Sequence, residues 1–341
     1  MEIAREFRMR YRRRVQVVGG STYTVSLPKE WVRSLNLKHG SELVIEVMPD
    51  SSLKVRSSEE THPEEPLEEE LEVSSDAVEI SMIRLIASYV VGYDMMTVTC
   101  GDCPTTKLEE FVRLVTEKTI GLEITEKDKD TIVLQCLANI STFPFSEVLR
   151  TLVRLTLKSF ENIEEFLRSK TTEVREVLER DDLIDKLYLY GLRQLNQVLL
   201  GRINHSSIGL NSTAHTIYLA MTLKLLERIA DHLSDLVEDL EKLSTDTSNT
   251  HYRLLDYVES LRTKYIQVTN YLILEHESKK PESLGLLVDE LRRLESNVAG
   301  DPALLEHAGK EHLTRISAYL RDLIELLVDT YELDKLVVSL T

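Results

Sequence analysis

Residues 226–240 read Leu-Glu-Arg-Ile-Ala-Asp-His-Leu-Ser-Asp-Leu-Val-Glu-Asp-Leu, and residues 313–327 read Leu-Thr-Arg-Ile-Ser-Ala-Tyr-Leu-Arg-Asp-Leu-Ile-Glu-Leu-Leu, with 8 of 15 positions identical. In and just before the first copy, apolar residues recur in steps of three and four, which is the buried seam of a helical bundle: Leu219, Leu223, Leu226, Ala230, Leu233, Val237 and Leu240. This internal duplication predicts two similar helical halves.

The pattern from Pro144 to the end of the chain is helical and shows no strand signal. Helix periodicity and the breaks at Pro281 and Pro302 predict six helices, at 145–169, 172–202, 212–243, 251–277, 282–298 and 303–339. Because the duplicated stretch ends each half, we expect two tandem three-helix bundles, at residues 144–247 and 248–341.

The preceding residues divide into three further parts. Residues 77–143 alternate helical and strand patterns, which predicts a small α+β unit. Residues 57–76 contain nine acids, two prolines and neither Lys nor Arg, a composition typical of a self-repelling linker. The expected fold is therefore mainly α, with an N-terminal β-rich domain over residues 1–56.

Charge separates the N-terminal domain from the rest of the chain. Residues 1–56 carry 11 Lys or Arg against 6 Asp or Glu, a net charge of +5, whereas the whole chain of 341 residues carries −17. A basic module suits nucleic acid, and the acidic remainder would attract cations. We expect no membrane insertion and a cytoplasmic location, since no long apolar run or secretion signal is present.

Residues 13–56 predict two short strands, a short helix after Pro28 and a closing hairpin. About fifty residues rarely bury enough surface to fold alone, so a shared homodimer core is the simplest solution. The segments Val15-Gln-Val-Val-Gly-Gly-Ser21, Val25-Ser-Leu-Pro-Lys-Glu-Trp31 and Leu37-Lys-His-Gly-Ser-Glu42 resemble the AbrB, MazE and SpoVT family of swapped-hairpin DNA-binding domains.

That resemblance implies an intertwined dimer, a swapped-hairpin β-barrel, that presents basic side chains to DNA. The candidate DNA contacts are Arg8, Arg10, Arg12, Arg13, Arg14 and Lys29.

Two acid pairs lie on neighbouring predicted helices of the first half. Asp181 and Asp185 are four residues apart on one, and Glu227 and Asp231 are four apart on the next, so each pair shares a helix face. Four converging carboxylates repel one another unless cations neutralise them. The alternative is a solvated acidic face without a metal. The second copy carries Thr314 and Ala318 where the first has Glu227 and Asp231, so at most one cluster is expected.

The bundles, the segment Glu179-Arg-Asp-Asp-Leu-Ile-Asp185 and the motif Leu226-Glu-Arg-Ile-Ala-Asp-His232 resemble the PhoU family of phosphate-uptake regulators. The family implies metal clusters of iron or zinc held by paired acids, while magnesium and calcium remain alternatives. The implied ligands are Asp181, Asp185, Glu227 and Asp231. The family also implies contact with a phosphate-transporter ATPase or a sensor kinase.

Other candidate sites have simpler interpretations. Cys100-Gly-Asp-Cys103 has zinc or redox spacing, but only Cys136 remains to complete a set, which favours free thiols. His215 and His232 are expected to be bundle or surface residues. The alternative for His232, which adjoins Asp231, is a residue that supports a metal ligand without binding the metal itself.

No catalytic motif is present, since the chain has no phosphate-binding loop or activated nucleophile and its Glu-x-x-His lies in the linker. The sequence therefore predicts a non-enzymatic regulator of phosphate uptake or phosphate response that binds DNA and metal. The alternative is an accessory protein that docks to a transporter or kinase and uses its N-terminal barrel only to dimerise.

Overall fold

The computed structural model describes residues 10–47, 51–58, 66–101, 103–169, 174–242, 248–273, 281–304 and 309–340. The chain divides into two compact units, with the boundary between residues 65 and 66. Within the described residues, no helix combines the length and the apolar character needed to cross a membrane.

The N-terminal unit consists of two antiparallel hairpins and one short helix. A turn at Gly19 and Gly20, both with positive φ that glycine adopts without strain, joins the first two strands. Helix α1 begins directly after Pro28, as predicted. The elements are β1 (Gln16–Val18), β2 (Thr22–Thr24), α1 (Lys29–Ser34), β3 (Leu43–Val47) and β4 (Leu53–Ser57).

The described part of this N-terminal unit has no buried side chain. Its apolar residues are instead exposed, among them Val17 at 57%, Tyr23 at 76%, Ile45 at 60% and Val47 at 77%. One copy of this unit therefore does not enclose a hydrophobic core of its own.

The second unit begins with a four-stranded sheet of order β5-β6-β8-β7, in which β5 and β6 are parallel and the other pairs antiparallel. Two helices, which pack against each other, complete this α+β part. The elements are β5 (Glu68–Glu72), α2 (Val78–Val91), β6 (Met95–Thr99), α3 (Thr105–Glu117), β7 (Leu122–Lys127) and β8 (Thr131–Cys136).

Strand β5 corrects the sequence analysis, which assigned residues 57–76 to a linker. Residues 68–72 instead form an edge strand beside β6. Three of its acids, Glu68, Glu70 and Glu72, face solvent, while Leu71 and Val73 are buried in the sheet core. Residues 59–65 of the predicted linker lie outside the described residues.

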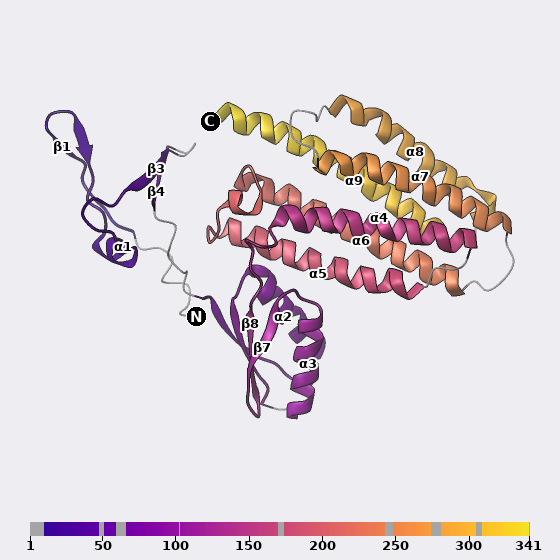
Figure 1. Cartoon of the computed structure of the whole chain (residues 1–341), viewed down its shortest axis with the longest axis horizontal. Helices are drawn as coiled ribbons and strands as arrows, with labels where there is room; N and C mark the ends of the chain where they lie inside the picture. The colour runs from indigo at the N-terminus through magenta and orange to yellow at the C-terminus, as the bar shows by residue number, and fades with distance from the viewer. Residues whose placement is uncertain are drawn as a thin grey trace. The chain divides into compact units, whose positions relative to one another are not determined.

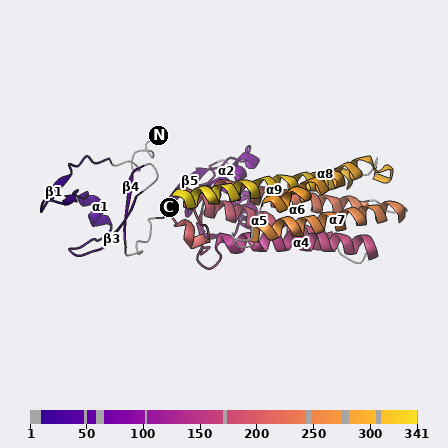
Figure 2. The ribbon, with the colours of Figure 1, turned by 90° about the horizontal axis from the view of Figure 1, so that it is seen from above.

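Six long helices form the rest of this unit, and Figures 1 and 2 show them lying lengthwise beside one another. They confirm the mainly α prediction and all six predicted helices. The two halves pack along their lengths, with α6 on α9 and α4 on α7. The helices are α4 (Phe145–Ser169), α5 (Val174–Leu199), α6 (Thr216–Lys242), α7 (Ser248–Ile273), α8 (Gly285–Gly300) and α9 (Gly309–Leu340).

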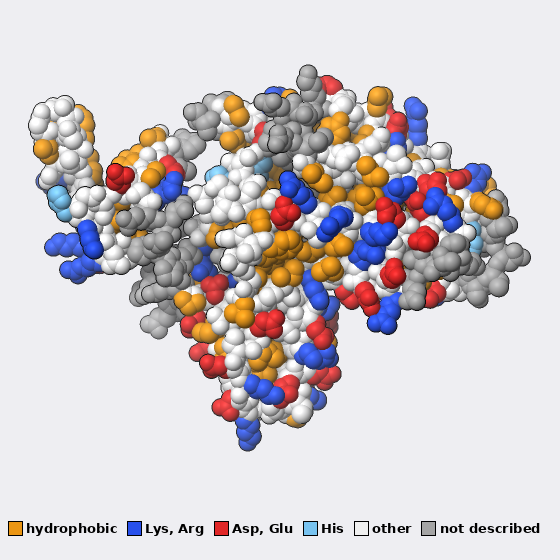
Figure 3. Space-filling view, in the orientation of Figure 1, with side chains coloured by type: hydrophobic (Ala, Val, Ile, Leu, Met, Phe, Trp, Pro, Cys, Tyr) orange, Lys and Arg blue, Asp and Glu red, His pale blue; other side chains and the backbone are white. Residues whose placement is uncertain are grey.

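The face of this helical body seen in Figure 3 is mixed in charge, with basic and acidic side chains interspersed over it. Its interior is apolar and continuous with that of the α+β part. Gly191 allows α5 and α6 to approach closely, because a Cβ at this position would lie 2.6 Å from Leu223 Cδ1. This close approach brings together the two helices that carry the predicted acid pairs.

Arg193 of α5 joins the helical body to the α+β part. Its guanidinium donates to the carbonyl oxygens of Tyr89 at 2.6 Å and Tyr93 at 2.8 Å, and to the Asp94 carboxylate at 3.0 Å. Arg202 forms a second ion pair with Asp94 at 2.9 Å. The Arg193 side chain is only 5% exposed, so these contacts are shielded from water.

Replacing Arg193 with Met is expected to lower the free energy of unfolding by about 3–5 kcal/mol, because it leaves buried carbonyl oxygens and Asp94 without their partner. Urea denaturation measures this effect. The control is Arg175→Met, which removes an exposed ion pair with Glu179 and should cost less than about 1 kcal/mol. Equal losses for both variants would show that Arg193 does not anchor the junction.

Candidate functional site

The predicted acid pairs meet where α5 lies against α6. One carboxylate oxygen from each of Asp185, Glu227 and Asp231 lies within 4.8 Å of the other two. Asp181 is one helical turn from Asp185, and its carboxylate interacts electrostatically with both Asp185 and Asp231. The structure therefore brings together three of the four residues named from the sequence, with Asp181 electrostatically coupled to them, and we call the four residues the carboxylate cluster.

Two oxygen atoms of the carboxylate cluster are buried and lack a hydrogen-bond partner among the described residues, namely Asp181 Oδ1 and Glu227 Oε2. The Glu227 side chain is only 9% exposed. Its other oxygen accepts a hydrogen bond from Lys224, whose Nζ also lies 4.9 Å from the centre of the Tyr188 ring. Unsatisfied buried carboxylate oxygens are costly unless a cation or a proton occupies them.

The local electrostatics favour neutralisation of these acids. Burial, followed by repulsion from Asp231 and Asp185, raises the pKa of Asp181 to about 7. Burial and then the charges of Glu227 and Asp185 raise the pKa of Asp231 to about 6. Burial likewise raises the pKa values of Asp185 and Glu227. A bound cation would relieve the repulsion that these shifts reflect.

The carboxylate cluster opens into a cavity of about 200 Å³ between the helical body and the α+β part. Asp185 and Glu227 line it together with two cations, Lys118 at the end of α3 and Lys186 of α5. The remaining lining residues are Ile86, Glu117, Asp182, Tyr188 and Leu189. The cavity thus offers carboxylates to a cation and lysines to an anion in one place.

The two histidines considered from the sequence lie elsewhere. His215 is buried, and its Nε2 lies 2.7 Å from Asp334 Oδ1 of α9, so it serves as a core contact. His232 faces α9, where its Nδ1 lies 3.0 Å from His312 Nδ1. His312 was not predicted as a partner of His232, because two residues 80 positions apart in the sequence share no periodic signal.

The N-terminal basic residues Arg10, Arg12, Arg13, Arg14 and Lys29 are all exposed. Arg8 lies outside the described residues. The Arg13 guanidinium lies 5.3 Å from the centre of the Tyr11 ring, and the Tyr11 hydroxyl donates to Glu30 of α1. These contacts hold the arginine-rich segment, residues 10–14, beside α1 and leave its charges exposed to solvent.

The expectation of free thiols at Cys100 and Cys103 is wrong, since the two form a disulfide. The turn from β6 to α3 places their Cα atoms 5.7 Å apart, within the range that a disulfide spans. Cys136 is a free thiol.

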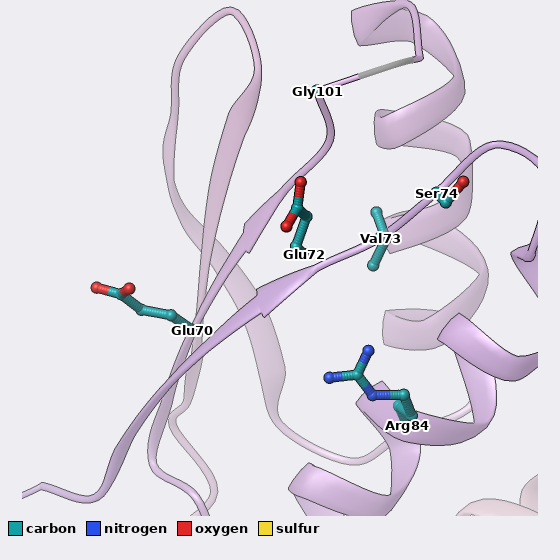
Figure 4. Close-up of a pocket in the computed structure, with 6 residues that line it drawn as sticks. All are labelled: Glu70, Glu72, Val73, Ser74, Arg84 and Gly101. Atoms are coloured by element: carbon teal, nitrogen blue, oxygen red, sulfur yellow. The ribbon is translucent and has the colours of Figure 1, made fainter. Parts of the chain in front are cut away.

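A second cavity, of about 680 Å³, lies beside the edge strand β5 (Figure 4). Glu70 and Glu72 of β5 and Arg84 of α2 contribute its charges. The remaining lining residues are Val73, Ser74 and Gly101. These few groups do not form a set of metal ligands.

Comparison with known families matches both parts of the chain. Residues 16–61 match the family described as antidote-toxin recognition MazE, bacterial antitoxin. Residues 149–240, which cover nearly all of α4 to α6 including the carboxylate cluster, match the PhoU domain. The chain joins a MazE/AbrB-like domain to a PhoU domain. No curated protein and no solved structure matches it.

These matches confirm the two resemblances seen in the sequence. Both families consist of non-enzymatic regulators. The match to the PhoU domain ends at residue 240, and in the second half residues 313–327 repeat residues 226–240 at 8 of 15 positions. The second copy lacks counterparts of Glu227 and Asp231, since Thr314 and Ala318 occupy their positions.

Proposed function

We propose that this protein is a cytoplasmic regulator of phosphate uptake or phosphate response. In this proposal the N-terminal unit dimerises and binds DNA, and the first helical half holds metal in the carboxylate cluster. The main support for this proposal is that one chain combines a basic N-terminal unit without a core of its own and a region matching the PhoU domain in which three acids converge.

The exposed apolar side chains of the N-terminal unit support a homodimer. Val17, Tyr23, Ile45 and Val47 are each more than half exposed. Full burial of an apolar side chain of this size stabilises a protein by about 1.5–3 kcal/mol, which these side chains do not gain in a single copy. A second copy of the same unit would cover them and form the core that one copy lacks. The match to MazE antitoxins, a class that commonly dimerises and binds DNA, agrees with this arrangement.

The exposed basic side chains of the N-terminal unit support DNA binding. Arg10, Arg12, Arg13, Arg14 and Lys29 are exposed, and dimerisation would present two such sets. Lys and Arg side chains that neutralise phosphates release counterions, so the affinity should fall steeply with salt. The acidic remainder of the chain would repel DNA and confine contact to this unit.

The carboxylate cluster fits a metal ion, because it supplies several oxygen donors and contains two buried oxygens without partners. An all-oxygen donor set suits iron, magnesium or calcium better than zinc, which prefers nitrogen and sulfur. Asp181, Asp185, Glu227 and Asp231 would hold the ion, which would supply positive charge at the floor of the cavity. Lys118 and Lys186 would then favour an anion such as phosphate in the same cavity.

Replacing Arg12, Arg13 and Arg14 together with Gln tests DNA binding. We expect the log–log slope of affinity against salt to flatten by about one unit for each lost phosphate contact. The DNA is a fragment that the full-length protein selects from genomic DNA, with a scrambled fragment as reference. The control replaces Arg175, Arg292 and Arg293, which are equally exposed on the helical body, and should leave the slope unchanged.

The alternative function, docking to a transporter ATPase or a sensor kinase, predicts a different outcome. In that case the N-terminal arginine variant and its control would show the same weak binding to both fragments. The N-terminal unit would then serve only to dimerise the protein.

A further inference from the structure

We propose a second metal site, of zinc type, formed by His232 and Asp235 of α6 and His312 of α9. One ligand atom from each of the three residues lies within 4.8 Å of the other two. This histidine site is separate from the carboxylate cluster, because its third ligand comes from α9, whereas the cluster uses α5. It does not depend on DNA binding.

The two histidine rings face each other through their Nδ1 atoms, at 3.0 Å. Two nitrogen ligands at about 2.0–2.1 Å from one tetrahedral zinc ion would be about 3.3 Å apart. The present distance between the two Nδ1 atoms is slightly shorter than this, so a small opening of the rings would give the geometry of a coordinated pair.

Asp239 decides which nitrogen of His312 is available to a metal. Its Oδ2 lies 3.3 Å from His312 Nε2. Because a carboxylate oxygen only accepts, this contact favours the tautomer with its proton on Nε2, which directs the lone pair of Nδ1 toward His232. A carboxylate that holds the outer nitrogen of a ligating histidine is the common second layer of zinc sites. The contact between Asp239 and His312 involves a residue outside the three proposed ligands, and it favours metal binding by His312 Nδ1.

The surroundings hold the rings in place and leave one side open. The Tyr319 ring stacks on His232 with centroids 5.6 Å apart, and the His312 side chain is only 13% exposed. Asp235 is exposed, so water or another ligand can reach the fourth coordination position. The donor set of two imidazoles and one carboxylate is one that zinc uses.

The proposed ligands come from both helical halves. His232 and Asp235 belong to the first helical half, whereas His312 lies at the start of the last helix of the second half. A metal ion bound here would link the two halves where α6 packs on α9. We expect zinc to stabilise the native arrangement by mass action and to raise the melting temperature.

The test uses the full-length protein, stripped with a chelator and then titrated with zinc in competition with a chromophoric chelator. We expect His232→Gln and His312→Asn each to weaken one zinc-binding equivalent at least about tenfold, and Asp239→Asn to weaken it by about 10–100-fold. The matched control is Asp322→Asn, because Asp322 occupies the position of Asp235 in the second copy and is also exposed. It should not change zinc affinity.

X-ray absorption of the wild-type protein with one zinc equivalent gives a second test, which needs no variant to fold. Two imidazole nitrogens at about 2.0–2.1 Å from zinc would support the site. An all-oxygen shell would overturn it, as would histidine variants that bind zinc like the wild type. Loss of zinc in Asp185→Asn/Glu227→Gln/Asp231→Asn but not in the histidine variants would also overturn it, and would assign the ion to the carboxylate cluster.

Discussion

Deleting residues 1–65 is expected to abolish sequence-specific DNA binding, with the affinity for a selected genomic fragment falling by about 10³-fold or more to that for a scrambled one. The reason is that the exposed arginines and the expected dimer core both lie in this unit. Affinity measured at several salt concentrations, together with the molar mass in solution, tests both roles.

The deletion should leave the metal content unchanged, because the carboxylate cluster lies wholly within residues 66–341. Circular dichroism and metal analysis of the remaining body provide the control. Sequence-specific DNA binding by residues 66–341 alone would contradict the assignment of DNA binding to the N-terminal unit. Loss of metal from a body that is still folded would contradict the independence of the two units.

Replacing Asp185 with Asn, Glu227 with Gln and Asp231 with Asn is expected to remove the metal from the carboxylate cluster. Amides keep the shape of these side chains but lack the charge that neutralises a cation. Metal analysis after gel filtration, with iron, magnesium and calcium offered in turn, measures the loss. The control is Asp322→Asn/Glu325→Gln, which alters the acids retained in the second copy and should bind metal like the wild type.

The same variant should change how the stability of the metal-free protein depends on pH. Asp181 and Asp231 have native pKa values of about 7 and about 6, well above the value near 4 of an unfolded aspartate. Between these values the native state binds more protons than the unfolded state, so stability falls as the pH rises. Allowing for solvent screening, we expect a loss on the order of 2 kcal/mol between pH 5 and pH 8.

Urea denaturation of the metal-free wild type at these two pH values measures that loss. The triple amide variant should show a flatter dependence, because the amide at position 231 no longer titrates and the repulsive part of the Asp181 pKa shift is lost, although its burial remains. Saturating metal should reverse the trend in the wild type, since the ion favours the ionised form. An equal pH dependence in wild type and variant would show that these acids are solvated and uncoupled.

The sequence by itself determined the local elements and the duplication. Helix α4 covers Phe145–Ser169, as predicted. Apolar periodicity is a local property that follows from the repeat of each element, so it can be read without neighbours. The four acids were also predicted together, because i,i+4 spacing puts each pair on one face and consecutive helices pack side by side.

Only the tertiary structure decided which distant segments meet. The acids of residues 68–72 suggested a linker, yet β6 provides a strand partner and buries Leu71. The Cys100–Cys103 disulfide depends on the turn between β6 and α3. His312 reaches His232 because α9 packs on α6. Contacts of this kind depend on how helices and strands pack in space, and the periodicity of a single element carries no record of its partner.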